Sequence, residues 1–287
     1  MFTLDQWPRF EDAPLYNENL LLGAQYFESE PLLAAPPSYG NQKDELDAFE
    51  EGCALSDLCG MTMLLITGEN SYGFCSASLA NSSLAVGQSE FTAVLSGDGS
   101  LCATPLASRT GDNEHLLCDP TERGLGLEPW LSFLAGIEQK GFRPFEGVKV
   151  EDVSTSLLPL LLWGPKAQAV LGDYVSSLDK LPKPGHVASV MLDRIQCIVC
   201  APDCHGETCY LLLVPPQAAR VLWRSFLSFP VVQPAGLQSL VTHAESVLPW
   251  LDDALSPDRI EPTLSLLSSW KLARKEGGFV GARALAQ

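Results

Sequence analysis

The residues best suited to chemistry lie close together near position 200. Four cysteines and one histidine fall between Cys197 and Cys209. Thiolate and imidazole groups bind zinc, and thiolates also hold iron–sulfur clusters. However, Cys197 and Cys200 lie in an apolar run that predicts a strand, where an odd separation places them on opposite faces. No second Cys-x-x-Cys or His-x-x-x-His element completes a ligand set. We therefore predict no metal, with Cys197, Cys200, Cys204 and Cys209 as buried or turn cysteines.

The remaining histidines do not form a recognisable catalytic pattern. His115, His186 and His243 lie at no diagnostic spacing from a nucleophile. The chain lacks the Gly-x-Ser-x-Gly element of many hydrolases, although a Ser-His-Asp triad assembles only in the fold. It also lacks a phosphate-binding Gly-x-x-x-x-Gly-Lys loop and a Gly-x-Gly-x-x-Gly fingerprint. Hydrolysis and nucleotide binding are therefore poor first hypotheses.

Two groups of carboxylates are predicted to be structural. Asp252 and Asp253 predict a loop or a helix cap. A second group is predicted to form the solvated face of a helix that starts near Lys43: Glu45, Asp47, Glu50 and Glu51.

Composition and charge indicate a folded protein that does not bind nucleic acid. The chain has 287 residues, of which 46% are hydrophobic and 18% are charged. This length allows one large or two modest domains. The formal net charge of −17 repels phosphate backbones, so nucleic acid is an unsuitable partner.

Cysteine usage and the lack of long apolar runs predict a cytoplasmic protein. The nine cysteines are an odd number in a chain long enough to fold without disulfides, which indicates mostly free thiols in a reducing compartment. No stretch reaches the ~18 apolar residues that a membrane helix needs. The first residues show no signal peptide, so we expect no membrane association.

The periodicities predict two α+β units after an N-terminal arm over residues 1–43. Within the first unit, we expect a helix over residues 43–53, which Asn41 or Asp44 caps. Strands are expected over 55–58, 61–67, 91–96, 101–108 and 115–118, with helices over 71–79 and 124–138. Gly97 to Gly99 predicts a hairpin turn.

A second unit of the same kind begins near residue 148. We expect strands over 157–163, 187–200 and 210–214, and helices over 165–175 and 216–227. Pro165 suits the first turn of its helix, and a last helix is expected to start at Gly281.

Several short segments resemble landmarks of the glycine-cleavage T-protein (aminomethyltransferase) family. The run from Ala54 to Met61 is similar to the family's Phe-Asp-Leu-Ser-His-Met opening. Residues 67–88 resemble its Gly-x-Asp-Ala…Leu-x-x-Gly stretch, and residues 91–99 its Tyr-Thr-x-x-Leu-Asn-x-x-Gly hairpin.

The resemblance continues in the same order through the second half of the chain. Residues 161–168 are similar to the family's Gly-Pro-x-Ala segment, and residues 205–223 to its Thr-Gly-Glu-x-Gly-Phe…Pro…Trp segment. Residues 234–237 and 278–285 resemble its later landmarks. The order of the landmarks across residues 50–285 is the strongest signal in the sequence.

The resemblance implies an α+β fold with two interleaved α/β units around a folate pocket. It places the folate-binding domain over residues 44–287, with subdomain boundaries near residues 50, 147 and 235. The family adds a C-terminal β-barrel after the segment that matches Gly281. The sequence stops six residues later, so we expect the barrel to be absent and a protein partner to complete that wall.

The resemblance also implies a depleted active site. The family's Asp-Asp pair after the hairpin corresponds to about Ala103 and Thr104, and its pterin-binding carboxylate to Leu211. An Arg is also missing near His243 and Glu245. The motif of the family's iron–sulfur maintenance members, Lys-Gly-Cys-Tyr-x-Gly-Gln-Glu, is absent.

The residues that remain nearest the matched motifs are the candidate ligands of tetrahydrofolate or another small molecule. They are Met61, Phe91, Asp119, Glu207, Tyr210 and Glu245. Glu207 falls in a predicted turn, where the alternative is a merely solvated side chain. Two functions remain open: a tetrahydrofolate-associated one-carbon (aminomethyl or methyl) transfer protein with a degraded catalytic site, or a non-catalytic binding or accessory protein that kept the fold.

Overall fold

The computed structural model describes residues 10–26, 35–81, 84–138, 140–245, 247–250 and 263–285. The chain divides into two compact units, each built from two separate segments. Unit 1 comprises Met1–Met61 and Ser154–Leu248, and unit 2 comprises Thr62–Val153 and Pro249–Gln287. Each unit thus joins residues that lie about 100 positions apart in the sequence.

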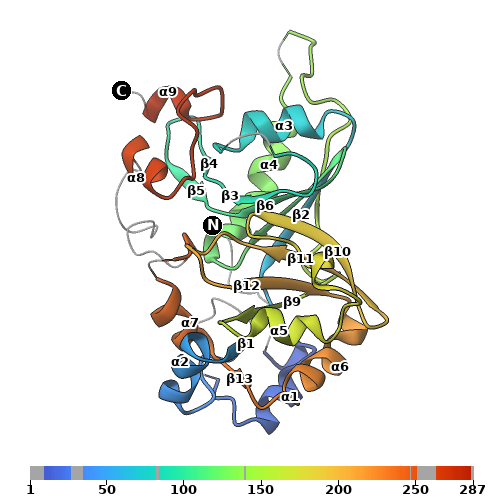
Figure 1. Ribbon diagram of the computed structural model, residues 1–287. Coiled ribbons are helices and arrows are strands. Elements are labelled where there is room, and N and C mark those ends of the chain that lie inside the picture. The colour runs from blue at the N-terminus through green and yellow to red at the C-terminus, as the bar shows by residue number, and fades with distance from the viewer. Residues whose placement is uncertain are drawn as a thin grey trace. The chain divides into compact units, whose positions relative to one another are not determined.

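Unit 1 is built on a mixed sheet that has six strands within the described residues (Figure 1). In sheet order the strands are β10 (His186–Leu192), β11 (Ile195–Ala201), β12 (Cys209–Val214), β9 (Leu158–Trp163), β1 (Cys53–Asp57) and β13 (Val232–Pro234). Neighbouring strands are antiparallel except β1 and β13, which are parallel.

Helices of unit 1 flank this sheet. They are α1 (Tyr16–Leu21), α2 (Gln42–Glu50), α5 (Ala167–Gly172), α6 (Pro216–Phe226) and α7 (Leu237–Ala244), with single 3-10 turns at Phe10–Asp12 and Leu178–Lys180. Helix α6 shows why the sequence folds this way. Its Ala219, Leu222, Trp223 and Phe226 recur at helical spacing and are all buried in the core.

The strands of this sheet present alternate residues to that core. On β12, Tyr210, Leu212 and Val214 belong to the core cluster that α5 and α6 cover. The intervening Leu211 and Leu213 lie on the opposite face, because side chains alternate along a strand. Both are fully buried.

Unit 2 is built on an antiparallel sheet of five strands in the part of the chain that the structure describes. In sheet order these are β3 (Ser89–Phe91), β6 (Leu106–Gly111), β7 (Glu114–Asp119), β2 (Thr62–Thr67) and β8 (Lys149–Asp152). Strands β4 (Val94–Leu95) and β5 (Leu101–Ala103) form a separate hairpin around Gly97 to Gly99, as the sequence predicts.

Helices α3 (Ser71–Ser78) and α4 (Leu127–Ala135) pack on one face of the five-stranded sheet. Phe74 and Leu131 join the same core as Leu64, Ile66 and Leu117 from β2 and β7. The C-terminal segment adds α8 (Leu264–Ser269) and α9 (Ala282–Leu285). Apolar residues of this segment form a smaller core with the β4–β5 hairpin. The α+β class expected from the sequence is confirmed.

Several predicted elements are interrupted where the backbone cannot continue a ladder. The strand predicted over residues 101–108 is two strands, β5 and β6, which belong to different sheets. They are separated at Pro105, which has no N–H to donate. The strand predicted over 91–96 likewise divides into β3 and β4. The stretch over 187–200 is a hairpin that turns at Asp193, whose φ is +54°.

Some predicted helices have different boundaries in the structure. Residues 122–126 form a 3-10 turn (Glu122–Gly126), so the helix predicted from Gly124 begins at Leu127 and ends at Ala135. Helix α2 ends at Glu50 because strand β1 already begins at Cys53. Asn41 caps α2, as predicted, through its side chain and the N–H of Asp44.

Glu45 corrects the prediction of a wholly solvated acidic face on α2. Its side chain is 3% exposed. Oε1 accepts hydrogen bonds from Ser38 Oγ (3.1 Å) and Tyr39 N (2.7 Å), and Oε2 accepts from Gly236 N (2.8 Å) and Ser239 Oγ (2.8 Å). A buried carboxylate is tolerated only where such donors replace water.

The same carboxylate anchors the start of α7. The first amides of that helix also donate to Pro36 O (from Leu237, 3.1 Å) and Pro37 O (from Gln238, 2.9 Å). The backbones approach so closely that a Cβ on Gly236 would overlap Pro37 O. A negative charge at a helix N-terminus is also favourable to the helix dipole.

Removing Glu45 should therefore destabilise unit 1 far more than removing an exposed acid of the same helix. We expect Glu45→Ala to lower the free energy of unfolding by about 3–5 kcal/mol, because several buried donors lose their acceptor. Glu50→Ala, at an exposed position of α2, should change it by at most about 0.5 kcal/mol. Urea denaturation of both variants measures this, and equal effects of the two substitutions would refute the anchoring role.

Candidate functional site

Glu207 lies in the tight turn that joins β11 to β12. Its N–H donates to Cys204 O (3.0 Å), and His205 and Gly206 have φ values of +52° and +95°. Glycine adopts such a left-handed conformation without strain, which fits the predicted turn. The turn directs the Glu207 side chain toward the end of β9.

The Glu207 carboxylate is held by two ring N–H groups. Its Oε2 accepts from Trp163 Nε1 (2.6 Å) and from His243 Nε2 (2.9 Å). The Glu207 side chain is 42% exposed and that of His243 13% exposed. Glu207 is therefore oriented by partners, so the alternative of a merely solvated side chain is wrong.

Aromatic rings fix the position of His243. Its imidazole stacks on Phe49, with ring centroids 4.7 Å apart, and meets Trp163 edge-on at 5.1 Å. Because α2 carries Phe49 and α7 carries His243, the Glu45 anchor between these helices also supports the imidazole. We call Phe49, Trp163, Glu207 and His243 the Glu207 cluster.

The other predicted residues of unit 1 are less suited to a ligand. Tyr210 points into the core with Leu212, and its burial raises the pKa of the phenol. Met61 is fully buried, and its N–H donates to Leu58 O (3.1 Å). Glu245 follows α7 and is exposed, two residues beyond His243.

Asp119 is the predicted site residue with the strongest constraints in unit 2. It ends β7 and is fully buried. Oδ1 accepts from Thr121 N (2.9 Å) and Thr121 Oγ1 (2.6 Å), and Oδ2 accepts from Thr104 N (3.3 Å). Burial raises the pKa of Asp119 to about 6, which these hydrogen bonds and the nearby Arg123 partly oppose.

Thr104 links Asp119 to the β4–β5 hairpin. Thr104 immediately follows β5, and Ala103 before it is fully buried in the core. The backbone of this segment therefore touches the Asp119 carboxylate, although neither position is itself acidic. Phe91, the remaining predicted residue, ends β3 and meets Trp250 edge-on with ring centroids 5.1 Å apart.

Two buried or oriented groups escaped the sequence prediction. The spacing of His243 links it to no nucleophile in the sequence, and only the fold brings it to Glu207. Asp57, at the end of β1, accepts from Asn19 Nδ2 (2.9 Å) and Cys59 N (2.9 Å), and burial raises its pKa to about 6. Asp57 thereby fastens helix α1 to the sheet of unit 1.

None of the nine cysteines, all of which lie in the described part of the chain, forms a disulfide. Cys197 joins the core beneath α5 and α6, whereas Cys200, three residues later on β11, belongs to the other face. Among the described residues, no group of three or more His, Cys, Asp or Glu side chains could hold a metal ion. None of the helices that the structure describes is long and apolar enough to cross a membrane.

Comparison with known proteins assigns this fold and these segments to one family. The family model described as "GCVT N-terminal domain" matches residues 12–257. The match covers most of the sequence, so the chain belongs to the GCVT N-terminal domain family. The family resemblance inferred from the landmarks is thus confirmed.

Curated relatives that the chain matches include aminomethyltransferases. The aminomethyltransferase of Bacillus mycoides (strain KBAB4) is 25% identical over 259 residues, which cover 88% of this chain and 68% of that protein. The aminomethyltransferase of Caldanaerobacter subterraneus subsp. tengcongensis is 25% identical over 290 residues, which cover 99% and 73%. Among solved structures, glycine cleavage system aminomethyltransferase T from Bartonella henselae has the same fold, with a TM-score of 0.77 and 21% identity over 95% of this chain and 73% of that one.

Asp119 should make stability depend on pH. Its raised pKa means that the folded state holds this proton more tightly than the unfolded state between about pH 4 and pH 6. The stabilisation by the protonated form is complete below about pH 4 and is lost as the pH rises through 6. The unfolding free energy of the wild type, relative to Asp119→Asn, should thus fall by on the order of 2–3 kcal/mol between about pH 4 and pH 7. Urea denaturation across this range measures it.

A second substitution separates this effect from that of Asp57. The carboxyl of Asp57 has a pKa raised in the same direction, so Asp57→Asn should remove its own part of the pH dependence and leave that of Asp119. If the unfolding free energies of the wild type and Asp119→Asn changed with pH in parallel, the raised pKa of Asp119 would be refuted.

The Glu207 cluster predicts an unequal effect of two nearby carboxylates. Glu207→Ala should lower the free energy of unfolding by about 1–2 kcal/mol, because the buried Trp163 Nε1 loses its acceptor. The exposed Glu245→Ala should change it by at most about 0.5 kcal/mol. Thermal or urea denaturation measures the stability of both variants. If Glu207→Ala left the free energy of unfolding unchanged, the Glu207 side chain would be merely solvated.

Proposed function

We propose that this chain is a tetrahydrofolate-associated one-carbon protein of the T-protein type whose site for aminomethyl transfer is degraded. Family membership supports the tetrahydrofolate association, because its relatives are aminomethyltransferases. The candidate contacts in unit 1 are the Glu207 cluster and the exposed Glu245. Such a protein binds a reduced folate weakly and does not accept an aminomethyl group from a lipoyl carrier.

The observation that carries this proposal is the nature of position 211. The resemblance assigns the family's pterin-binding carboxylate to Leu211, which is fully buried on β12 between Leu161 and Cys200 of the neighbouring strands. A pterin edge offers an amino group and a ring N–H to one carboxylate. Two charge-assisted hydrogen bonds of about 1.5–3 kcal/mol each are then missing. This loss corresponds to roughly 10²-fold or more in affinity.

The acids that remain do not replace the missing ones. At the positions matched to the family's Asp-Asp pair, Ala103 is apolar and Thr104 is neutral. Asp119 lies beside Thr104, but its oxygens already accept from Thr104 and Thr121. A carboxylate committed to neighbouring donors is poorly placed to orient a folate and hold a transferred group.

A gain-of-affinity substitution tests the assignment of position 211. Leu211→Glu should raise the affinity for tetrahydrofolate about tenfold or more, because it restores an acceptor for the pterin donors. Leu213→Glu is the matched control, since Leu213 is equally buried on the same face of β12. It should weaken or leave unchanged the binding of folate. Isothermal titration calorimetry measures affinity, and urea denaturation verifies that each variant folds.

The unmodified protein provides the independent measurement. The aminomethyltransferase of Bacillus mycoides, titrated in parallel, serves as the reference for a working enzyme. Weak binding and no aminomethyl transfer support the proposal. Binding as tight as the reference, with transfer, overturns it.

The same losses favour a second candidate, a non-catalytic accessory protein that kept the fold. Loss of acids removes chemistry while the apolar cores of both units remain complete. A protein partner then supplies what the site lacks. Measurable folate binding favours the one-carbon protein, and the absence of any folate binding at a folded, stable chain favours the accessory protein.

A further inference from the structure

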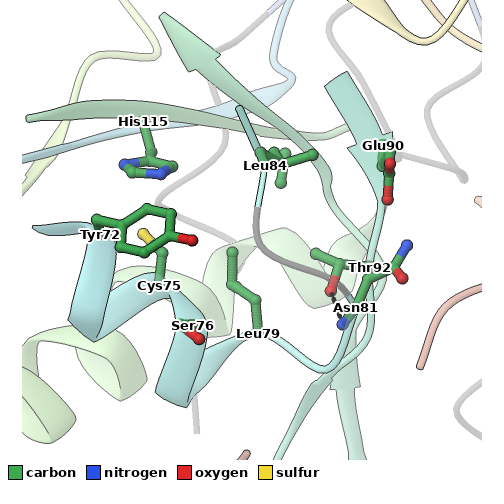
Figure 2. Close-up of a pocket in the computed structure, with 10 residues that line it drawn as sticks. Tyr72, Cys75, Ser76, Leu79, Asn81, Leu84, Glu90, Thr92 and His115 are labelled. Atoms are coloured by element: carbon green, nitrogen blue, oxygen red, sulfur yellow. Dashed lines mark hydrogen bonds between the residues drawn. The ribbon is translucent and has the colours of Figure 1, made fainter. Parts of the chain in front are cut away.

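The edge strands of the unit 2 sheet are short and charged. Strand β3 has three residues, and its Glu90 lines the small cavity beside α3 that Figure 2 shows. That cavity offers about 20 Å³, which is room for about one water molecule. Strand β8 has four residues, of which Lys149, Glu151 and Asp152 are charged. Short strands and charges are devices by which proteins keep the edges of their sheets from pairing with other chains.

The two edges of the unit 1 sheet differ from each other. Strand β13, at one edge, has three residues and ends at Pro234, which has no N–H to donate. Strand β10, at the other edge, has seven residues and contains no Asp, Glu, Lys, Arg or Pro. Its pairing with β11 is continuous, so no bulge bends it. Among the four edge strands that the structure describes in these two sheets, β10 is therefore the one without a protective device.

Strand β10 presents a row of backbone groups at its outer edge. Leu192 pairs with Ile195 across a two-residue turn, and a pair that closes such a turn exchanges both of its N–H···O bonds. Because these bonds alternate along an antiparallel ladder, the N–H and C=O groups of Val187, Ser189 and Met191 point away from β11. Within the described residues, none of these backbone groups has a hydrogen-bond partner.

The side chains of β10 hold the strand in place and leave its outer half accessible. Val190 and Leu192 belong to the core that α5 and α6 cover. Ser189 and Met191 lie on the opposite face and are exposed, Met191 to 53%. The edge is thus a well-positioned template for one more strand, and part of the surface beside it is apolar.

We propose that a second copy of this chain covers this edge, and that the two β10 strands pair in antiparallel order about a two-fold axis at Ser189. Ser189 then lies opposite Ser189 of the other copy, and Val187 lies opposite Met191. Each outward N–H donates to an outward C=O of the other strand, so every group of the row is paired. Val187 and Met191 also bring apolar side chains together on one face.

Charge favours a second copy in this orientation. The formal net charge of −17 makes two copies repel each other, so an uncharged strand is where they approach at the least cost. Lys183 precedes β10, and Asp193 and Arg194, which together are neutral, follow it; all three are exposed. Antiparallel pairing places Lys183 of each copy near the neutral end of the other, with Asp193 beside it. Parallel pairing would place the two lysines side by side.

Sedimentation equilibrium of the full chain tests this interface. Over about a hundredfold range of concentration, the wild type should show an equilibrium between monomer and dimer. Ser189→Lys and Ser189→Glu should each raise the dissociation constant of the dimer at least about tenfold, because like charges then face each other across the axis. An equimolar mixture of the two variants should dimerise again, because Lys then faces Glu.

Ser228→Lys is the matched control. Ser228 is exposed and lies shortly before β13, at the opposite edge of the same sheet, so this variant should dimerise like the wild type. Circular dichroism verifies that each variant folds. A wild type that stays monomeric at every concentration would overturn the proposal. A dimer that neither Ser189 variant weakens would overturn β10 as the interface, and a mixture that stays monomeric would overturn the pairing about Ser189.

Discussion

One buried carboxylate organises the part of unit 1 that carries the Glu207 cluster. Glu45, on helix α2, joins the neighbouring residues 38–39 to the start of α7, where Gly236 lies 191 positions later in the sequence. Helix α2 contributes Phe49 and helix α7 contributes His243, so the orientation of the imidazole depends on how these helices meet. The carboxylate of Glu207 then accepts from His243 and Trp163. The buried carboxylate of Glu45 thus helps to set the geometry around the partly exposed carboxylate of Glu207.

The carboxylates of Asp57, Asp119 and Glu207 fall into two classes, buried and partly exposed. Asp57 and Asp119 are fully buried, accept hydrogen bonds from close neighbours and have pKa values raised to about 6 by burial. Glu207 is partly exposed and keeps contact with solvent. Glu207 can therefore meet a ligand from the solvent side, provided that it keeps its hydrogen bond to the buried Trp163 Nε1. Any residual ligand chemistry in this chain is therefore better served by Glu207 than by Asp119.

The sequence predicted the elements better than the environment of its polar residues. Helical spacing in α6 and apolar runs such as residues 157–163 specified most helices and strands, and Gly97 to Gly99 specified a hairpin. Periodicity could not show that Pro105 separates strands of different sheets, because that depends on long-range pairing. It placed Glu45 on a solvated face because the donors that bury it come from residues 38–39 and 236–239. Asp119 and Glu207 were found through family landmarks, and the partner His243 only through the fold.

The alternation of the two units has a consequence for how the chain folds during synthesis. Strands β2 to β8 of unit 2 come from one continuous segment, Thr62–Val153, so their sheet can assemble soon after that segment leaves the ribosome. Strand β1 is made earlier but must wait for β9 and β13, about 100 and 180 residues later. Until then its apolar residues lack their partners. Strand β1 is thus made before β2 to β8 but reaches its native sheet after them, and its unpaired apolar residues are exposed to aggregation in the interval.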